Sequence, residues 1–204
     1  MTIIKDIINQ NKRLSSIAEV IAELSEEIQI PSFLVGGCVR DLMLDPGVDS
    51  IDIDIMVEGD GIQFAQQLAN KLGVGKIVPF PKFATAKIPY KECEIEVASA
   101  RLETYDKGSR SPSSVTLADI KDDLMRRDFR VNAMAVSLNK NNYGEFIDPF
   151  KGLDDLRDKI LRTPLEPDST FSDDPLRMVR AAYFASTHSI YTYYDSKLLL
   201  LGAK

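Results

Sequence analysis

The sequence is poor in the residues that many enzymes use for covalent or thiolate chemistry. Its 204 residues include one histidine, two cysteines and no tryptophan. The lone His188 lies near the C-terminal end and cannot supply a histidine-based catalytic triad for the body of the chain. Cys38 and Cys93 are too few for a disulfide framework and too far apart for a metal finger. We therefore expect two reduced thiols.

Long apolar runs and a basic charge excess are also missing. No stretch reaches the length of a transmembrane helix, and the first residues, MTIIKD, lack the cationic and then apolar order of a signal peptide. We therefore expect a cytoplasmic protein with no membrane partner. The 31 acidic residues outnumber the 25 basic ones and give a net charge of −6, which argues against a tight, non-specific grip on nucleic acid. Any such contact must be local.

The remaining composition predicts one mixed α/β domain with an appendage, because 44% of the residues are hydrophobic and can form a core. The strand-like runs follow one another too closely for long parallel crossovers, which predicts a largely antiparallel sheet. Ser15 or Ser16 is a possible cap of the first long helix. We expect helices at residues 15–27, 39–44 and 62–72, and strands at 33–35, 50–57, 74–78, 83–88, 93–98, 131–138 and 144–147.

Two aspartates form the first candidate site. In an extended strand over residues 50–57, Asp52 and Asp54 share one face, while isoleucines occupy the other. The two like charges repel each other, and a divalent cation that prefers oxygen ligands, such as Mg²⁺, would relieve that repulsion. The alternative is a half-buried strand whose polar face meets water, and an Asp-x-Asp triplet by itself favours that alternative.

A glycine turn before this strand favours the metal site over the solvent-facing strand. Gly36 and Gly37 stand between an apolar run and a predicted helix, which is typical of a phosphate cradle, because glycine lets a ligand approach the backbone. Arg40 offers a planar fork to phosphate oxygens, whereas Asp41 is also an ordinary helix-start residue. The glycine turn followed closely by Asp-x-Asp indicates magnesium-dependent nucleotidyl transfer.

On these residues the chain resembles the class II tRNA nucleotidyltransferase (CCA-adding enzyme) and bacterial poly(A) polymerase family of the DNA polymerase β superfamily. The resemblance runs from about residue 33 to residue 184. It implies a polymerase β-like head with a mixed, largely antiparallel sheet and flanking helices. It also implies that Asp52 and Asp54 bind catalytic Mg²⁺ ions. The first family motif matches Gly36, Gly37, Arg40, Asp41, Asp52 and Asp54.

The second family motif matches residues 126–129. The resemblance implies that Arg126, Arg127, Asp128 and the following Asn132 bind the sugar and phosphates of the incoming nucleotide. Arg130, where the family usually has threonine, would extend a cationic cluster with the other two arginines. A solvated helix end is the ordinary interpretation of such a cluster. A hinge motif matches residues 148–152 with Asp154 and Arg162.

The fourth motif lies at residues 173–177. The resemblance implies that Asp174 and Arg177 read the Watson–Crick edge of the incoming base, with Asp173 in place of the usual glutamate. Taken alone, Asp174 and Arg177 could instead form a surface ion pair on one helix face. Arg180 joins the candidate nucleotide-binding residues, and Tyr183 stands where the family often has arginine.

Two further segments belong to the expected active site. Glu96 precedes an arginine in a strand that looks like the family's source of a third catalytic acid, although it could also form a solvated edge pair with Glu94. The serine-rich stretch at residues 103–116 predicts a polar loop, and the resemblance implies the flexible loop that helps the last addition step.

We therefore expect an N-terminal helical segment at residues 1–30, a catalytic head at 31–150, and a hinge with the beginning of a truncated helical neck at 151–204. The implied reaction is template-independent addition of CCA, or part of it, to tRNA 3′ ends with CTP, ATP and Mg²⁺. RNA would be held mainly by regions beyond this chain. The alternatives are a poly(A) polymerase, a related transferase with a small-molecule or protein acceptor, and an inactive fragment that only binds nucleotide.

Overall fold

The computed structural model describes residues 2–48, 52–105, 112–187 and 193–194. Its helices are α1 (Thr2–Gln10), α2 (Lys12–Ile28), α3 (Gly37–Leu44), α4 (Gly61–Lys71), α5 (Ile120–Met125), α6 (Gly152–Asp158), α7 (Pro167–Asp173) and α8 (Leu176–Thr187). Short 3₁₀ turns are η1 (Pro81–Phe83), η2 (Arg130–Asn132) and η3 (Lys140–Asn142). The strands are β1 (Ser32–Val35), β2 (Ile53–Val57), β3 (Val78–Phe80), β4 (Thr85–Tyr90), β5 (Cys93–Ser99), β6 (Arg101–Tyr105), β7 (Pro112–Leu117), β8 (Ala135–Ser137), β9 (Phe146–Ile147), β10 (Ile160–Leu161) and β11 (Tyr193–Tyr194).

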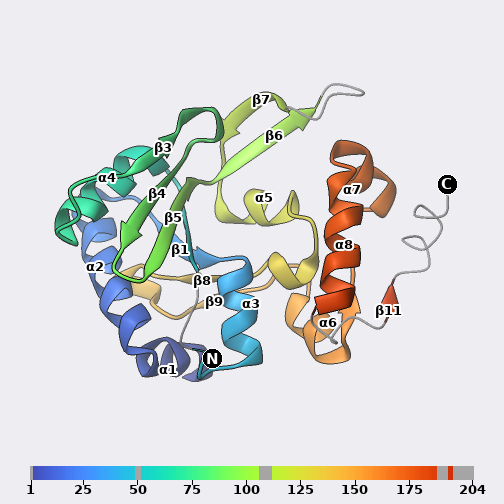
Figure 1. The fold of residues 1–204 in the computed structure, drawn as a ribbon, viewed down its shortest axis with the longest axis horizontal. Coiled ribbons are helices and arrows are strands. Elements are labelled where there is room, and N and C mark those ends of the chain that lie inside the picture. Colours follow the sequence, from blue (N-terminus) through green and yellow to red (C-terminus); the bar gives the residue numbers. More distant parts are fainter. Residues whose placement is uncertain (1, 49–51, 106–111, 188–192, 195–204) are drawn as a thin grey trace.

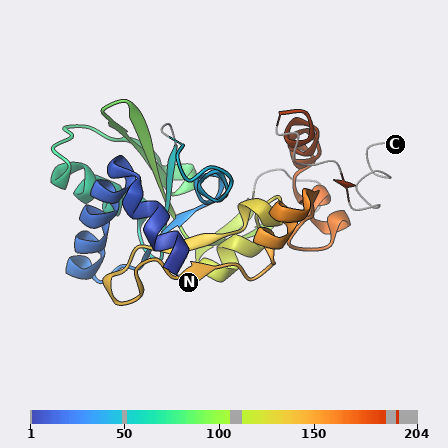
Figure 2. The same cartoon turned by 90° about the horizontal axis from the view of Figure 1, so that it is seen from below.

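The main sheet has seven strands in the order β3-β4-β5-β2-β1-β8-β9. Among the described residues, β2 and β5 pair in parallel and the other neighbouring strands of this sheet pair antiparallel. This confirms the mixed, largely antiparallel sheet with flanking helices. Figures 1 and 2 both show α6, α7 and α8 at the end of the molecule opposite α2 and α4.

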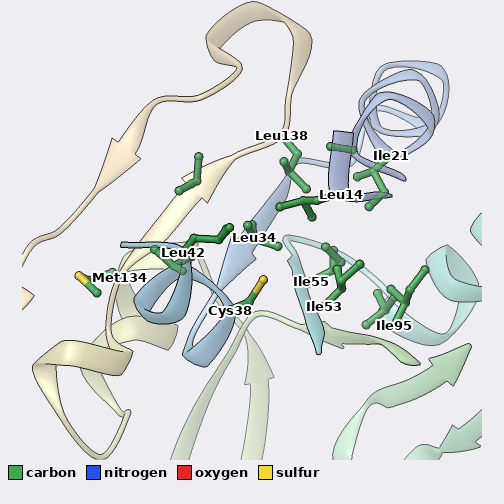
Figure 3. Packing of buried hydrophobic residues seen from close by; sticks show 14 of the residues in the cluster. Leu14, Ile21, Leu34, Cys38, Leu42, Ile53, Ile55, Ile95, Met134 and Leu138 are labelled. Atoms are coloured by element: carbon green, nitrogen blue, oxygen red, sulfur yellow. The ribbon is translucent and has the colours of Figure 1, made fainter. Parts of the chain in front are cut away.

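Each face of the sheet buries its own set of side chains, because successive residues of a strand point to opposite sides. In β1, Leu34 belongs to the larger core cluster, whereas Phe33 and Val35 belong to a smaller one that includes Leu124 of α5. The larger cluster joins the sheet to α2 and α4, and Figure 3 shows part of it, with Leu14, Ile21, Leu34, Ile53 and Ile55 among the labelled side chains.

The same alternation fixes the direction of Asp54. In β2, Ile53, Ile55 and Val57 lie in the larger cluster and Met56 lies in the smaller one. Asp54 therefore points to the face that α5 covers. The predicted apolar face of this strand is correct, but the strand begins only at Ile53. Asp52 is exposed and lies ahead of β2, so the two aspartates are not neighbours within one regular strand.

Several predicted boundaries are wrong. The first long helix begins at Lys12, and its cap is Asn11, whose side chain accepts a 3.0 Å hydrogen bond from the Leu14 amide. The strand predicted at 74–78 lies instead at Val78–Phe80, where Pro79 is tolerated because β3 is an edge strand. The strand predicted at 131–138 is shorter because a 3₁₀ turn occupies its first residues.

The polar loop predicted at residues 103–116 is also wrong in part. β6 and β7 form an antiparallel hairpin there, and residues 106–111 lie outside the described residues. Cys38 and Cys93 are both free thiols, as expected. The helices of the described residues are all too short or too polar to cross a membrane.

Candidate active site

A cleft of about 740 Å³ opens between the α5 face of the sheet and helix α8. It collects residues from seven elements (α3, β2, β4, β5, β6, η2 and α8) and from three of the four sequence motifs, all but the hinge motif. Its lining comprises Gly36, Gly37, Arg40, Asp54, Met56, Thr85, Glu96, Ala98, Arg101, Arg126, Arg127, Asp128, Asn132, Asp174, Arg177, Arg180, Tyr183 and Phe184. Of the residues expected to act in catalysis or nucleotide binding, Asp52 is outside this lining, as are Asp41 of the first motif and Arg130 of the expected arginine cluster. Another cavity, of about 460 Å³, lies beside α2 and η3 and contains none of those motif residues.

Two carboxylates face the cleft from adjacent strands. Asp54 of β2 and Glu96 of β5 are register partners in the parallel pair. Burial raises the pKa of Asp54 to about 6; Arg127 opposes this rise, whereas the negative charges of Glu96 and Asp52 add to it. Burial and the neighbouring acids therefore disfavour the charged form of Asp54 more than Arg127 favours it. On the outer side, Lys87 Nζ lies 3.6 Å from a Glu96 carboxylate oxygen and 2.5 Å from one of Glu94.

We call Asp54 and Glu96 the acid pair. The glycine turn brings the backbone close to Asp54. Gly36 has φ = +70°, a conformation that favours glycine, and a Cβ there would lie 2.8 Å from Nη1 of Arg127 and 3.5 Å from Oδ2 of Asp54. Helix α3 begins directly afterwards, at Gly37 rather than at the predicted residue 39. The positive φ explains why glycine is favoured at this position, since the end of the flexible Arg127 side chain could move away from a Cβ.

A buried aspartate that the sequence analysis missed holds two of the arginines. Asp123 of α5 is fully buried and forms ion pairs with Arg126 and Arg127, the second at 3.2 Å. The spacing of three and four residues on a helix was the available signal. Arg130 does not join this cluster, because its Nε donates to the carbonyl of Thr163 at 3.0 Å and it does not line the cleft. The predicted three-arginine cluster is therefore a pair.

A chain of hydrogen bonds crosses the floor of the cleft. Nη1 of Arg40 donates to Oδ1 of Asn132 at 2.7 Å, and Nδ2 of Asn132 donates to Oδ1 of Asp128 at 3.1 Å. Nε of Arg180 then donates to Oδ2 of Asp128 at 2.7 Å. The ring of Phe184 lies between the two guanidinium groups, 5.1 Å from Arg40 and 5.7 Å from Arg180. These contacts therefore connect helix α8 to helix α3, which follows the glycine turn.

Asp174 and Arg177 both face the cleft but do not pair with each other. Oδ1 of Asp174 accepts from the Leu176 amide at 3.0 Å, which places it at the start of α8. Arg177 donates from Nη2 to the carbonyl of Arg126 at 2.9 Å and from Nη1 to that of Thr170 at 3.4 Å. The surface-ion-pair alternative is therefore wrong.

The predicted hinge motif is a helix cap. Asp148 accepts hydrogen bonds from the amides of Gly152 and Leu153, at 2.7 and 3.0 Å, and so begins α6. Arg162 pairs with the buried Asp155 at 2.5 Å rather than with Asp154. A Cβ at Gly152 would collide with the Arg130 carbonyl. The motif thus fixes the chain that leads from the sheet to α7 and α8.

The acid pair offers suitable donors for a divalent cation. Magnesium prefers oxygen ligands and commonly takes one or two carboxylates together with substrate phosphates. Asp54 and Glu96 provide such carboxylates from adjacent strands, and a bound cation would stabilise the charged form of Asp54. Within the described ranges, no three histidine, cysteine, aspartate or glutamate side chains gather around one point.

Known proteins resemble this chain over most of its length. The family model "Poly A polymerase head domain" matches residues 32–162. The A-adding tRNA nucleotidyltransferase of Aquifex aeolicus is 46% identical over 154 residues, which cover 76% of this chain and 18% of that enzyme. The A-adding tRNA nucleotidyltransferase of Halalkalibacterium halodurans is 39% identical over 167 residues, which cover 81% of this chain and 38% of that enzyme. The chain thus spans well under half the length of these curated relatives.

Solved structures give the same result. The apo form II of a CCA-adding enzyme has a TM-score of 0.83 at 34% identity, covering 97% of this chain and 46% of that one. A tRNA nucleotidyltransferase complexed with a primer tRNA and an incoming ATP analog has a TM-score of 0.73 at 36% identity, covering 89% and 50%. The chain therefore belongs to the poly A polymerase head domain family, within the class II tRNA nucleotidyltransferase group that its motifs predict.

Proposed function

We propose that this chain carries the catalytic head of a tRNA nucleotidyltransferase, which adds nucleotides from CTP or ATP to an RNA 3′ end and releases pyrophosphate. The observation that carries the proposal is the gathering of the acid pair, the glycine turn, two arginines and the Asp174–Arg177 motif in one cleft. We keep residues 31–150 as the head, 1–30 as a helical segment and 151–204 as the hinge and start of a neck. A cytoplasmic location is part of the same proposal.

Carboxylates from this side of the cleft would hold the metal. Asp52 and Asp54 remain the proposed Mg²⁺ ligands, and Glu96, the register partner of Asp54, remains the proposed third catalytic acid. Bound magnesium would activate the terminal ribose hydroxyl and neutralise the leaving oxygens. Because both strands are internal to the sheet, the two carboxylates on them are held in a fixed relation to each other.

The remaining residues would bind and orient the nucleotide. Arg126 and Arg127, held by Asp123, would neutralise the triphosphate, and the amides of the glycine turn would donate hydrogen bonds to its oxygens. Asn132 and Asp128 would contact the ribose, while Arg40 would act by positioning Asn132. Asp174 and Arg177 would read the base edge.

Among the possible additions, the comparisons favour the terminal adenosine. The A-adding relatives are 46% and 39% identical to the chain, whereas a CCA-adding enzyme of Lactobacillus delbrueckii is 32% identical. ATP is then the proposed donor, and a tRNA that already ends in CC is the proposed acceptor.

Single-nucleotide addition tests this proposal. The protein is incubated with Mg²⁺, one labelled triphosphate at a time, and tRNA transcripts that lack CCA, end in C or end in CC. We expect label from ATP on the CC-ended transcript, and none with Asp54→Asn. Addition of many adenosines would instead identify a poly(A) polymerase. Absence of any addition by a folded, ATP-binding protein would support the nucleotide-binding fragment.

A further inference from the structure

Beside the cleft, two aromatic rings stand exposed on the outer edge of the sheet. Phe80 of β3 is 37% exposed and Phe83 of η1 is 51% exposed. Both line a small cavity of about 290 Å³, together with Thr85, Lys87, Glu96 and Arg101. We call Phe80 and Phe83 the aromatic platform. An exposed aromatic ring can stack on the base of a single-stranded nucleic acid, which makes this surface a candidate binding site.

The platform is continuous with the cleft. Thr85, Glu96 and Arg101 line both the small cavity and the cleft. Arg126, Arg127, Asp174 and Arg177 line the cleft alone, on its α5 and α8 side. The platform therefore borders the Glu96 side of the cleft, and none of the proposed nucleotide-binding residues lines its cavity.

The backbone beneath Phe83 is firmly held. Its carbonyl accepts hydrogen bonds from Oγ1 of Thr85, at 3.0 Å, and from Nη1 of Arg101. The next residue, Ala84, has φ = +47°, and its carbonyl accepts from the Ser99 amide at 3.0 Å. A turn with this many contacts holds its exposed ring at a fixed distance from Glu96, as a recognition surface requires.

The charges around the platform suit a nucleic-acid strand. Nζ of Lys82 lies 5.8 Å from the centroid of the Phe83 ring, and Arg101 lines the small cavity, as does Lys87, which also pairs with Glu94 and Glu96. Single-stranded RNA is bound where aromatic side chains stack on bases and nearby cations meet the phosphates. A protein strand is a poorer occupant of this edge, because β3 has three residues and Pro79 has no amide hydrogen to donate.

We propose that the 3′-terminal base of the acceptor RNA stacks on Phe83, with Phe80 extending the platform. This places the terminal ribose hydroxyl next to Glu96 and Asp54, opposite the triphosphate. The proposal rests on the proposed function, since it assigns the binding site of the RNA acceptor in that reaction.

Fluorescence of a modified RNA tests the stacking directly. The probes are two single-stranded RNAs that carry 2-aminopurine either as the 3′-terminal base or in the middle of the strand. The variants are Phe83→Ala, Phe83→Leu and Phe83→Tyr. Leu165→Ala is the matched control, because Leu165 is 41% exposed and lines neither cavity. ATP binding to each variant is measured by calorimetry to verify folding.

We expect the parent protein and Leu165→Ala to quench the terminal probe. Phe83→Ala and Phe83→Leu should lose the quenching and bind RNA about five-fold or more weakly, because base stacking on an aromatic ring is lost. Phe83→Tyr should retain both properties, and ATP affinity should not change. If the terminal probe is quenched but no nucleotide is ever transferred, the result would support RNA binding at the aromatic platform and contradict the proposed reaction.

The opposite results would overturn the platform. These are unchanged quenching and RNA affinity in Phe83→Ala, quenching of the internal probe alone, or no RNA binding by the parent protein. Self-association that disappears in Phe83→Ala, without any RNA effect, would assign the same surface to a second copy of the chain. RNA extension that proceeds equally in the parent and in Phe83→Ala would leave the proposed function intact and remove this inference.

Discussion

Nη1 of Arg40 donates a 2.7 Å hydrogen bond to Oδ1 of Asn132, which lies 92 positions later in the chain. Arg40 belongs to helix α3 and Asn132 to the 3₁₀ turn η2, which follows α5. Arg40 also pairs with Asp41 at 2.8 Å, and its guanidinium lies 5.1 Å from the Phe184 ring of α8. One buried side chain therefore joins three parts of the cleft.

Replacing this arginine by lysine tests that junction. Arg40→Lys keeps the charge, but a single ammonium cannot hold both Asp41 and Asn132 in the planar arrangement of a guanidinium. We expect the free energy of unfolding to fall by about 1–3 kcal/mol, measured by urea denaturation. Arg157→Lys, an exposed arginine of α6, is the control and should be neutral. Equal losses in both variants would contradict the bridging role.

The raised pKa of Asp54 predicts a specific pH dependence. The folded protein holds this proton more tightly than the unfolded chain, whose carboxyl titrates near 3.8. Between about pH 4 and pH 6 the unfolded state releases the proton first, so the stability that Asp54 contributes at low pH is lost as the pH rises. The loss reaches up to about 3 kcal/mol for a shift of this size.

Asp54→Asn should remove that loss. Without metal, in EDTA, the variant should gain stability relative to the parent as the pH rises through this window, while nucleotide transfer is abolished. Denaturation at several pH values measures the difference between the two proteins. Asp158→Asn, at an exposed aspartate, should follow the parent. A parent and an Asp54→Asn curve that run parallel across the window would refute the assignment.

How far the sequence predicts the site depends on the range of each interaction. Gly36 and Asp54 could be assigned because their roles follow from local conformation, a turn and an alternating strand. Asp123 was missed because its importance comes from complete burial, which depends on how α5 packs against the sheet. Arg130 was misassigned for the same reason, since it lies in η2, beyond the end of α5, and its side chain turns to the carbonyl of Thr163.

The fold errors have a related cause. The β6–β7 hairpin contains serines and a proline, residues with little strand preference, and the pairing between the two strands overrides that preference. The α8 residues Arg180 and Phe184 reach the cleft only because the capped α6 returns the chain toward it. Local patterns carry no information about such a return.

Asp123→Asn should weaken the contacts that hold Arg126 and Arg127 in the cleft. The aspartate is fully buried and balances the charges of Arg126 and Arg127, so neutralising it leaves cationic groups without their counter-charge. We expect a loss of about 3–5 kcal/mol in the free energy of unfolding, together with weaker ATP binding. Asp122→Asn, one position earlier on the same helix, is the control. Denaturation measures the free energy of unfolding and calorimetric titration measures the ATP affinity. If Asp123→Asn and Asp122→Asn have the same values, Asp123 does not anchor Arg126 and Arg127.

Arg177→Ala tests base recognition separately from phosphate binding. Arg177 is held by the carbonyls of Arg126 and Thr170 rather than by Asp174, so both side chains have polar atoms to offer a base edge. Correct hydrogen bonding to a base edge contributes about 1–3 kcal/mol of discrimination, which is roughly 5- to 150-fold in relative affinity. We therefore expect the preference among ATP, CTP, GTP and UTP to flatten by about that factor, while affinity for inorganic triphosphate is unchanged, since the glycine turn and the Asp123-held arginines are intact. Calorimetry on Arg177→Ala and on the control Arg157→Ala measures both quantities. An unaltered order of preference, or an equal loss for triphosphate alone, would assign Arg177 to structural support of α7 and the end of α5.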